Sequence, residues 1–252
     1  MDAVFRTDVG QVRPHNEDDG AFAIGENGLL LALVADGMGG HQAGDVASKM
    51  TKEYLLSKWQ EMNTVFSPKE AEKWLEDSIH EVNEHIFTHS KENVQCEGMG
   101  TTLVAAICSD QFVTVAHVGD SRIYMKTSAG LKQMTADHSL VGELVRSGQI
   151  TEDEAMHHPR KNVILRALGT EESIKVDVNT IDWDPGSYLL LCSDGLTDKL
   201  SDHEIDEELS KDVSLEMMAD RLIEMANERG GEDNVTITLL RHSDLQKDVS
   251  DE

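Results

Sequence analysis

The chain has 252 residues, of which 39% are hydrophobic and 28% charged, and a chain of this length and composition is expected to fold as one soluble domain. Its 48 acidic and 22 basic side chains leave a formal charge of -26, which argues against nucleic acid or an anionic membrane as a partner because phosphate groups would be repelled. We expect a cytoplasmic protein, since no stretch has the roughly 20 apolar residues of a membrane helix and the N-terminus lacks signal-peptide features.

The first third of the chain predicts a hairpin followed by two helices. Residues 21–24 and 29–35 have the composition of strands, and the Asn-Gly pair at 27–28 is typical of a tight hairpin turn. Helical spacing of apolar residues follows over 44–62. A second helix is predicted over 67–86, because Ser-Pro-Lys-Glu at its start combines a capping box with proline at the first helical position.

The middle of the chain predicts three strands and then a long insertion. Residues 101–108, 112–118 and 121–126 read as strands, and the short links between them predict antiparallel neighbours. The insertion, residues 138–169, carries signals for three short helices: 139–146, a Thr-x-x-Glu capping box at 151–154, and 162–168 closed by a glycine.

The last third predicts strands at 174–178, 188–193 and 235–241, with a short helix after residue 201 and a longer one over 214–229. Strands and helices therefore occur in separate runs along the chain. This order predicts an α+β fold, a central sandwich of two antiparallel β-sheets flanked by pairs of α-helices.

Domain organisation and cysteine usage are simple. We expect a single domain over 1–242 that includes the insertion, and a short acidic tail over 243–252. The three cysteines, Cys96, Cys108 and Cys192, have no CxxC spacing, so we expect reduced, packed thiols.

Aspartates stand at the ends of four apolar runs that read as buried strands. Asp36, Asp120 and Asp194 each follow such a run and precede a glycine or serine, while Asp233 stands just before VTITLL. The fold could bring these carboxylates into one mouth, where they would repel one another and be costly to desolvate. The natural interpretation is that cations lie among them.

The surrounding residues favour a hard cation. Asp36 lies in DGMGG, whose glycines let the chain turn tightly and bring a carbonyl toward an ion, although a plain glycine turn would look the same in isolation. Oxygen ligands suit Mg²⁺ or Mn²⁺, whereas zinc would favour histidine or cysteine, and neither clusters near these aspartates in the sequence. Upstream, Arg13 precedes the acidic run Glu17-Asp18-Asp19, which could equally be a solvated turn.

Eight motifs in order resemble a known family: TDVGQVRPHNED, VADGMGGHQAGDVAS, GMGTTLVAA, VGDSRIY, TADHSLV, NVILRALG, LLLCSDGLTD and GGEDNVTITLL. The chain resembles the bacterial metal-dependent serine/threonine protein phosphatases of type 2C over residues 5–240, and among them the Gram-positive enzymes paired with a transmembrane serine/threonine kinase. The resemblance implies a two-sheet sandwich with helix pairs outside it. It also implies two Mn²⁺ or Mg²⁺ ions at one end, with a third, weaker one.

The resemblance implies a role for each matching residue. Asp36 would bridge two metals and the attacking hydroxide, and Arg13 would bind the substrate phosphate. Asp120 with Asp194 would hold the third ion. The implied metal ligands are Glu17, Asp18, Asp36, the carbonyl of Gly37, Asp120, Asp194 and Asp233.

The implied reaction is direct hydrolysis of phosphoserine or phosphothreonine in proteins, with phosphorylated proteins such as the partner kinase and its cytoplasmic substrates as partners and a monomer as the default. One alternative is an inactive relative that binds phosphoproteins, and another is a nuclease or small-phosphoester hydrolase. Met38 departs from relatives that carry histidine at this position and cannot donate a proton; a metal-bound water or a histidine such as His41 could substitute. Glu232 departs too, because it adds negative charge next to Asp233. The insertion 138–169 resembles the variable flap of the family.

Overall fold

A computed structural model describes residues 1–26, 28–40, 43–62 and 66–243 of the chain. The predicted turn residue Asn27, the histidine His41 and the acidic tail from residue 244 lie outside the described residues. In the part that is described, none of the helices combines the length and apolar character needed to cross a membrane.

Two antiparallel sheets form the centre of the molecule. The strands of the first sheet, in spatial order, are β1 (Asp2–Asp8), β11 (Val235–Arg241), β10 (Tyr188–Cys192), β7 (Arg122–Thr127) and β8 (Gly130–Gln133). The strands of the second, in spatial order, are β2 (Asp18–Ile24), β3 (Leu30–Met38), β5 (Leu103–Cys108), β6 (Phe112–Val118) and β9 (Asp177–Asp182). The two-residue strand β4 (Gly100–Thr101) pairs with the end of β3.

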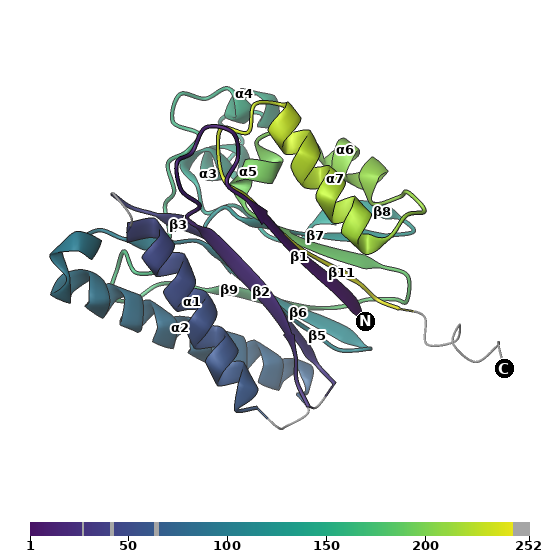
Figure 1. Cartoon of the computed structure of the whole chain (residues 1–252), viewed down its shortest axis with the longest axis horizontal. Coiled ribbons are helices and arrows are strands. Elements are labelled where there is room, and N and C mark those ends of the chain that lie inside the picture. Colours follow the sequence, from purple (N-terminus) through teal and green to yellow (C-terminus); the bar gives the residue numbers. More distant parts are fainter. Residues whose placement is uncertain (27, 41–42, 63–65, 244–252) are drawn as a thin grey trace.

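Helices cover the outer face of each sheet, which gives four layers (Figure 1). Against the second sheet lie α1 (Ala43–Gln60) and α2 (Pro68–Glu92), and α2 ends next to the 3₁₀ turn η1 (Val94–Cys96). Against the first sheet lie α5 (Asp194–Thr197), α6 (Asp202–Glu208) and α7 (Leu215–Glu228). Two short helices, α3 (Leu140–Arg146) and α4 (Glu152–Met156), belong to the insertion. The predicted α+β sandwich is confirmed.

The alternation of side chains along the strands builds three layers of core. On β3, Leu31 and Leu33 face the helices, while Leu30 and Ala32 face the other sheet. Both sets are fully buried. A strand with apolar residues on both faces therefore lies between two hydrophobic layers, as its continuous apolar run predicts.

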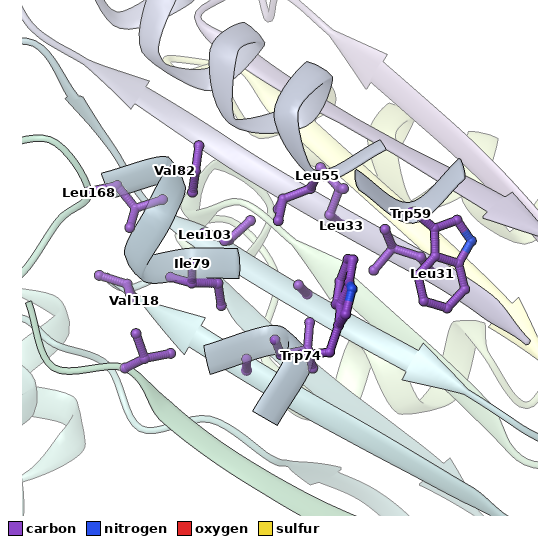
Figure 2. Packing of buried hydrophobic residues seen from close by; sticks show 14 of the residues in the cluster. Leu31, Leu33, Leu55, Trp59, Trp74, Ile79, Val82, Leu103, Val118 and Leu168 are labelled. Carbon is purple, nitrogen blue, oxygen red and sulfur yellow. The ribbon is translucent and has the colours of Figure 1, made fainter. Parts of the chain in front are cut away.

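The outer core between α1, α2 and the second sheet is closed by aromatic packing. Figure 2 shows Trp59 and Trp74 over Leu31 at one end of this layer. The two indole rings meet edge to face, with centroids 5.4 Å apart. The start of α2 is set as predicted: Ser67 accepts a hydrogen bond from the Glu70 amide, and the Glu70 side chain caps the Ser67 amide in return.

One prediction about strand pairing was wrong. The short link between 112–118 and 121–126 predicted antiparallel neighbours, yet β6 and β7 lie in different sheets. The intervening Gly119 adopts φ +106°, a conformation that favours glycine and turns the chain out of one sheet into the other. A link of three residues is therefore a crossing between layers rather than a hairpin.

The predicted helix at 162–168 is also wrong. Ile164 and Leu168 instead form isolated bridges with Ser139 and Thr101, so the backbone of this segment is extended where it leaves the insertion. Local helical spacing is overridden here by pairing with distant residues. The strand predicted at 174–178 begins later, at Asp177, although Ile174 and Val176 are buried as the alternation indicated.

Strands β1 and β8 and helix α5 were not predicted from the sequence. The other predicted strands and helices are present with shifts of a few residues at their ends. Cys96, Cys108 and Cys192 are free and buried, which confirms the prediction for the thiols.

The buried layer under α2 predicts a measurable cost of truncation. Ile79 is fully buried, and we expect Ile79→Ala to lower the free energy of unfolding by about 2–5 kcal/mol because it leaves a cavity between α2 and the sheet. Denaturant unfolding measures this. Val94→Ala is the matched control, since Val94 is 87% exposed and its truncation should change stability by less than about 0.5 kcal/mol.

Candidate metal centre

The carboxylates gather because antiparallel pairing places the end of one strand beside the start of its neighbour. Asp18 opens β2 and Asp36 lies directly opposite it near the end of β3. In the first sheet, Asp194 follows the end of β10 and Asp233 precedes the start of β11, and these two strands pair antiparallel. Asp120 lies in the crossing between β6 and β7. The same end of the sandwich carries the β1–β2 loop and the helices of the insertion (Figure 1).

The carboxylates at this end lie close enough to repel one another. Burial raises the pKa of Asp36 well above its ordinary value, and the negative charges of Asp18, Asp194, Asp120 and Asp233 raise it further. Burial likewise raises the pKa of Asp194, with added repulsion from Asp120, Asp198 and Asp233. Every strand-end aspartate predicted from the sequence thus contributes to one field of unbalanced negative charge.

Asp18 and Asp120 are the most buried members. Each is 8% exposed, and burial raises the pKa of each to about 6. Asp18 accepts a hydrogen bond of 2.7 Å from the Ser193 hydroxyl. Oδ1 of Asp120 is buried without a hydrogen-bond partner among the described residues. An orphaned carboxylate oxygen in such a field is costly unless a cation accompanies it.

The backbone around Asp36 is held by two threonines from the β4–β5 segment. Thr102 Oγ1 accepts a hydrogen bond from the Asp36 amide at 3.0 Å, and the Thr102 amide donates to the Asp36 carbonyl at 2.8 Å. Thr101 Oγ1 donates to the same carbonyl at 2.9 Å. The motif GMGTT therefore fixes the position of Asp36 rather than supplying a reactive group.

Gly37 is required by close packing. A Cβ atom at this position would lie 2.1 Å from the Gly44 carbonyl oxygen and 2.5 Å from that of Glu17. The Gly37 amide also donates to the Glu17 carbonyl at 3.1 Å. The glycines of DGMGG thus let three segments meet at the metal-binding end, which goes beyond the turn that the sequence predicted.

Asn234 is a site residue that the sequence analysis missed. Its Oδ1 accepts from the Glu17 amide at 2.8 Å, and its Nδ2 donates to the carbonyls of Val9 and His15 at 2.9 and 3.0 Å. One buried amide side chain therefore ties down both ends of the loop that carries Arg13. The available signal was its place beside Asp233, where a side chain with both donor and acceptor can bridge loops.

Arg13 lies at the rim of the carboxylate cluster. Its Nη2 donates to Asp233 Oδ2 at 2.7 Å, and its side chain stays 47% exposed. Burial raises the pKa of Glu17, which lies close enough to Arg13 and Asp233 to interact with their charges. All eight predicted site residues are thus placed at this end of the molecule.

Two further residues bear on the departures noted in the sequence. Met38 is partly exposed at the end of β3, where it pairs with Gly100. Glu232 forms an ion pair with Lys199, so its charge is compensated and does not add fully to that of Asp233.

The donor set fits hard divalent cations. Carboxylates and a backbone carbonyl are the ligands that Mg²⁺ and Mn²⁺ prefer. Burial and mutual repulsion raise the carboxyl pKa values, and Oδ1 of Asp120 has no hydrogen-bond partner among the described residues, so the cluster carries unbalanced negative charge. Fold and site together define a sandwich that presents an acidic, cation-binding end with an arginine at its rim.

Known proteins share these features. The sequence pattern of the protein phosphatase 2C family matches residues 11–239. The serine/threonine phosphatase stp of Listeria monocytogenes serotype 4b is 46% identical over 247 residues, covering 98% of each chain. The crystal structure of serine/threonine phosphatase Stp1 from Staphylococcus aureus superimposes with a TM-score of 0.92 at 40% identity, covering 96% of this chain and 94% of that one.

A third relative bears on the metals. The catalytic domain of the serine/threonine protein phosphatase PstP, solved in complex with two manganese ions, matches with a TM-score of 0.85 at 34% identity and covers 96% of this chain and 98% of that one. The chain belongs to the protein phosphatase 2C family. The family resemblance inferred from the sequence motifs is therefore confirmed.

The raised carboxyl pKa values predict a pH-dependent response to metal. Asp18 and Asp120 rise from 3.8 to about 6, so their favourable contribution to the stability of the metal-free fold is complete below about pH 4 and is lost as pH rises through about 6. Cations compete with these protons. We expect the increase in Tm caused by Mn²⁺ to grow between about pH 4.5 and pH 7, measured by calorimetry against protein kept in EDTA.

Asp18→Asn serves as the control for this titration. The variant cannot ionise at residue 18, so the metal-dependent gain in Tm should be smaller and should vary less with pH. A gain that is the same at every pH in the wild-type protein would contradict the assignment of the cluster.

Proposed function

We propose that this protein is an active metal-dependent protein serine/threonine phosphatase that hydrolyses phosphoserine and phosphothreonine. The observation that carries the proposal is a field of carboxylates with uncompensated charge next to the guanidinium of Arg13. Such an end can take up cations and then present both cations and arginine to a phosphate group. The named activities of the 46% identical Listeria relative and of the structural relatives support it.

The proposed ligands are the carboxylates of Glu17, Asp18, Asp36, Asp120, Asp194 and Asp233 with the Gly37 carbonyl. Asp36 would be a ligand of the central pair of ions, and it lies where the charges of four other aspartates act on it. Asp120 and Asp194 would share a third, weaker ion. When bound, Mn²⁺ or Mg²⁺ would supply a water of lowered pKa as the nucleophile and neutralise the phosphoryl oxygens.

The protein's own residues then orient the substrate. Arg13 now neutralises part of Asp233, and a cation taking over that role would leave the guanidinium able to donate two parallel hydrogen bonds to a phosphate. Asn234 holds the loop that carries Arg13 at a fixed distance from Asp233. No cysteine is needed as a nucleophile, and burial raises the pKa of the Cys192 thiol to about 12, which suits an inert residue.

The substrate class follows from charge. With a formal charge of -26, the protein repels nucleic acid, and this disfavours the nuclease alternative. An inactive binding module would not need the full set of oxygen donors together with Arg13. We propose phosphorylated proteins as partners, including a transmembrane serine/threonine kinase and its cytoplasmic targets, on the strength of the resemblance to the kinase-paired phosphatases of Gram-positive bacteria.

Hydrolysis of a phosphothreonine peptide with millimolar Mn²⁺ tests this function directly. We expect phosphate release that EDTA abolishes, and we expect Asp194→Ala to lose nearly all turnover because the ligand set is broken. Asp220→Ala removes an exposed aspartate of α7 that pairs with Arg6, and this variant should retain activity. A wild-type protein that releases no phosphate under these conditions would refute the proposal.

Arg13→Ala should act mainly on substrate binding. Loss of charge-assisted hydrogen bonds to the phosphate predicts a KM raised by about tenfold to a hundredfold with a smaller change in kcat. Arg13→Lys keeps the charge but lacks the planar guanidinium, so its KM should lie between those of the wild-type protein and Arg13→Ala. Steady-state kinetics with the peptide distinguish these cases, and a loss confined to kcat would contradict the assignment.

We propose that the insertion 138–169 is a flap that contributes to substrate preference. Met156 and Leu165 are 62% and 53% exposed in it, although both are apolar. Changing both to serine should alter the ranking of phosphopeptides of different sequence while leaving the Mn²⁺ requirement unchanged. Met217→Ser on α7, where the methionine is 60% exposed, is the control. An unchanged ranking, or a changed metal requirement, would count against this role.

A further inference from the structure

His117 and His138 lie together beside the turn that carries Asp120. Their rings stack with centroids 4.5 Å apart, and Asp177 lies next to them. No histidines cluster near the strand-end aspartates in the sequence, but the fold brings these two histidines together beside one of them. The ligand atoms of the three residues lie within 4.8 Å of one another, close enough to raise the question of a second metal site.

The charges around this cluster argue against a metal ion there. Arg166 Nη1 lies 2.9 Å from His138 Nε2 and 3.4 Å from Asp177 Oδ1, and Lys175 pairs with Asp177 at 3.0 Å. A cation among these groups would be repelled by two positive side chains. Asp177 already has its counter-charges: burial opposes ionisation, but the hydrogen bonds from Lys175 and His138 lower its pKa to about 2.

The hydrogen bonds of the His138 side chain instead join Asp177 to the turn that bears Asp120. Nδ1 accepts from the Gly119 amide at 3.1 Å, and Nε2 lies 3.2 Å from Asp177 Oδ2. Because Nδ1 accepts, a neutral imidazole carries its proton on Nε2 and donates it to Asp177. Nε2 then cannot also accept from Arg166, whose Nη1 donates to the Lys175 carbonyl at 3.2 Å and to Asp177 Oδ1 at 3.4 Å. Burial and the neighbouring His117 lower the pKa of His138 to about 4, consistent with the neutral form.

His138 also holds Gly119 through its backbone. Its amide donates to the Gly119 carbonyl at 2.9 Å, so both polar groups of Gly119 are bound by one residue. Gly119 in turn packs on Thr102, since a Cβ atom there would lie 2.6 Å from a Thr102 methyl group. Asp120 follows immediately, with its orphaned Oδ1 in the carboxylate cluster.

The same residue closes the base of the insertion. The His138 carbonyl accepts from the Leu165 amide at 2.7 Å, and the next residue, Ser139, bridges to Ile164. His138 is 5% exposed, so these contacts are sheltered from water. His138 thus links three parts of the molecule: its side chain contacts Asp177 and the Gly119 amide, and its backbone binds the Gly119 and Leu165 backbone groups.

We infer that His138 is a positioning residue: it fixes the Gly119–Asp120 turn against the base of the insertion and so sets where Asp120 meets Asp194 at the weakest cation site. This inference rests on the proposed function for the identity of the cations. It assigns to His138 no contact with substrate. Partners that orient a ligand from behind commonly change metal affinity by about 10–100-fold when removed.

Two amide substitutions separate the contacts of His138. In His138→Asn the side-chain oxygen occupies the region of Nδ1 and can accept from the Gly119 amide, but the side chain is too short to reach Asp177. In His138→Gln the terminal amide occupies the region of Nε2 and can reach Asp177, but no acceptor faces Gly119. The matched control is His117→Gln, because His117 is equally buried and stacks on His138 but bonds to Ala136 instead of Gly119.

Titration calorimetry with Mn²⁺ on the full-length proteins reads the outcome without activity. We expect His138→Gln to lower the affinity for the most weakly bound Mn²⁺ by about tenfold. In His138→Asn and His117→Gln this affinity should stay within about twofold of the wild-type value. Thermal unfolding of the same samples identifies losses that come only from the fold. Equal weakening in all three variants, weakening by His117→Gln alone, an unchanged His138→Gln, or a wild-type protein without a third ion would each overturn the inference.

Activity of the wild-type protein separates a failure of the proposed phosphatase function from a failure of the positioning role of His138. If the wild-type protein lacked phosphatase activity, the proposed function would fail, yet the calorimetric comparison of the variants would still test the role of His138. If activity were present and the variants bound Mn²⁺ alike, only the positioning role would fail.

Discussion

Repulsion among buried carboxylates is the constraint on which the working end of this protein depends. Asp18, Asp36, Asp120 and Asp194 raise one another's pKa or have it raised by burial, and Oδ1 of Asp120 lacks a partner among the described residues. A fold that gathers such groups is stable at neutral pH only at a cost in free energy unless cations join them. Cation binding is therefore the first requirement of this site, and substrate binding depends on it. Among the described residues, Arg13 is the one arginine that pairs with Asp233.

The sandwich can bear this cost because its three apolar layers are closely packed on both sides of each sheet. Leu31 and Leu33 lie under the helices, Leu30 and Ala32 lie between the sheets, and all four are fully buried. Polar side chains then fix the segments beyond the strands. Thr102 holds Asp36, Asn234 holds the loop of Arg13, and His138 holds the turn of Asp120. Precise placement of the carboxylates thus comes from neutral hydrogen-bonding residues behind them.

The errors in the sequence analysis share a physical cause. Gly119 turns the chain between sheets, and no local pattern distinguishes such a crossing from a hairpin link. The segment 162–168 has helical spacing, but its backbone pairs with Ser139 and Thr101 far away in the chain. The histidines His117 and His138 are 21 positions apart and meet only because the insertion returns to the end of β6. Each case depends on contacts between residues distant in sequence, which local periodicity does not encode.

The sequence by itself determined the layered α+β sandwich, the strand-end aspartates and the family, because apolar runs, capping boxes and eight ordered motifs are local signals that tertiary context rarely reverses. The strand-end pattern also identified Asp36, Asp120, Asp194 and Asp233, and the family motifs added Glu17 and Asp18. Only the tertiary structure decided which groups face one another: Asp18 opposite Asp36, Arg13 on Asp233, Asn234 behind Glu17 and His138 behind Gly119. The reason is physical, because charge and hydrogen bonding act over a few ångströms of space, and the distance between two residues in space is set by the packing of the sheets.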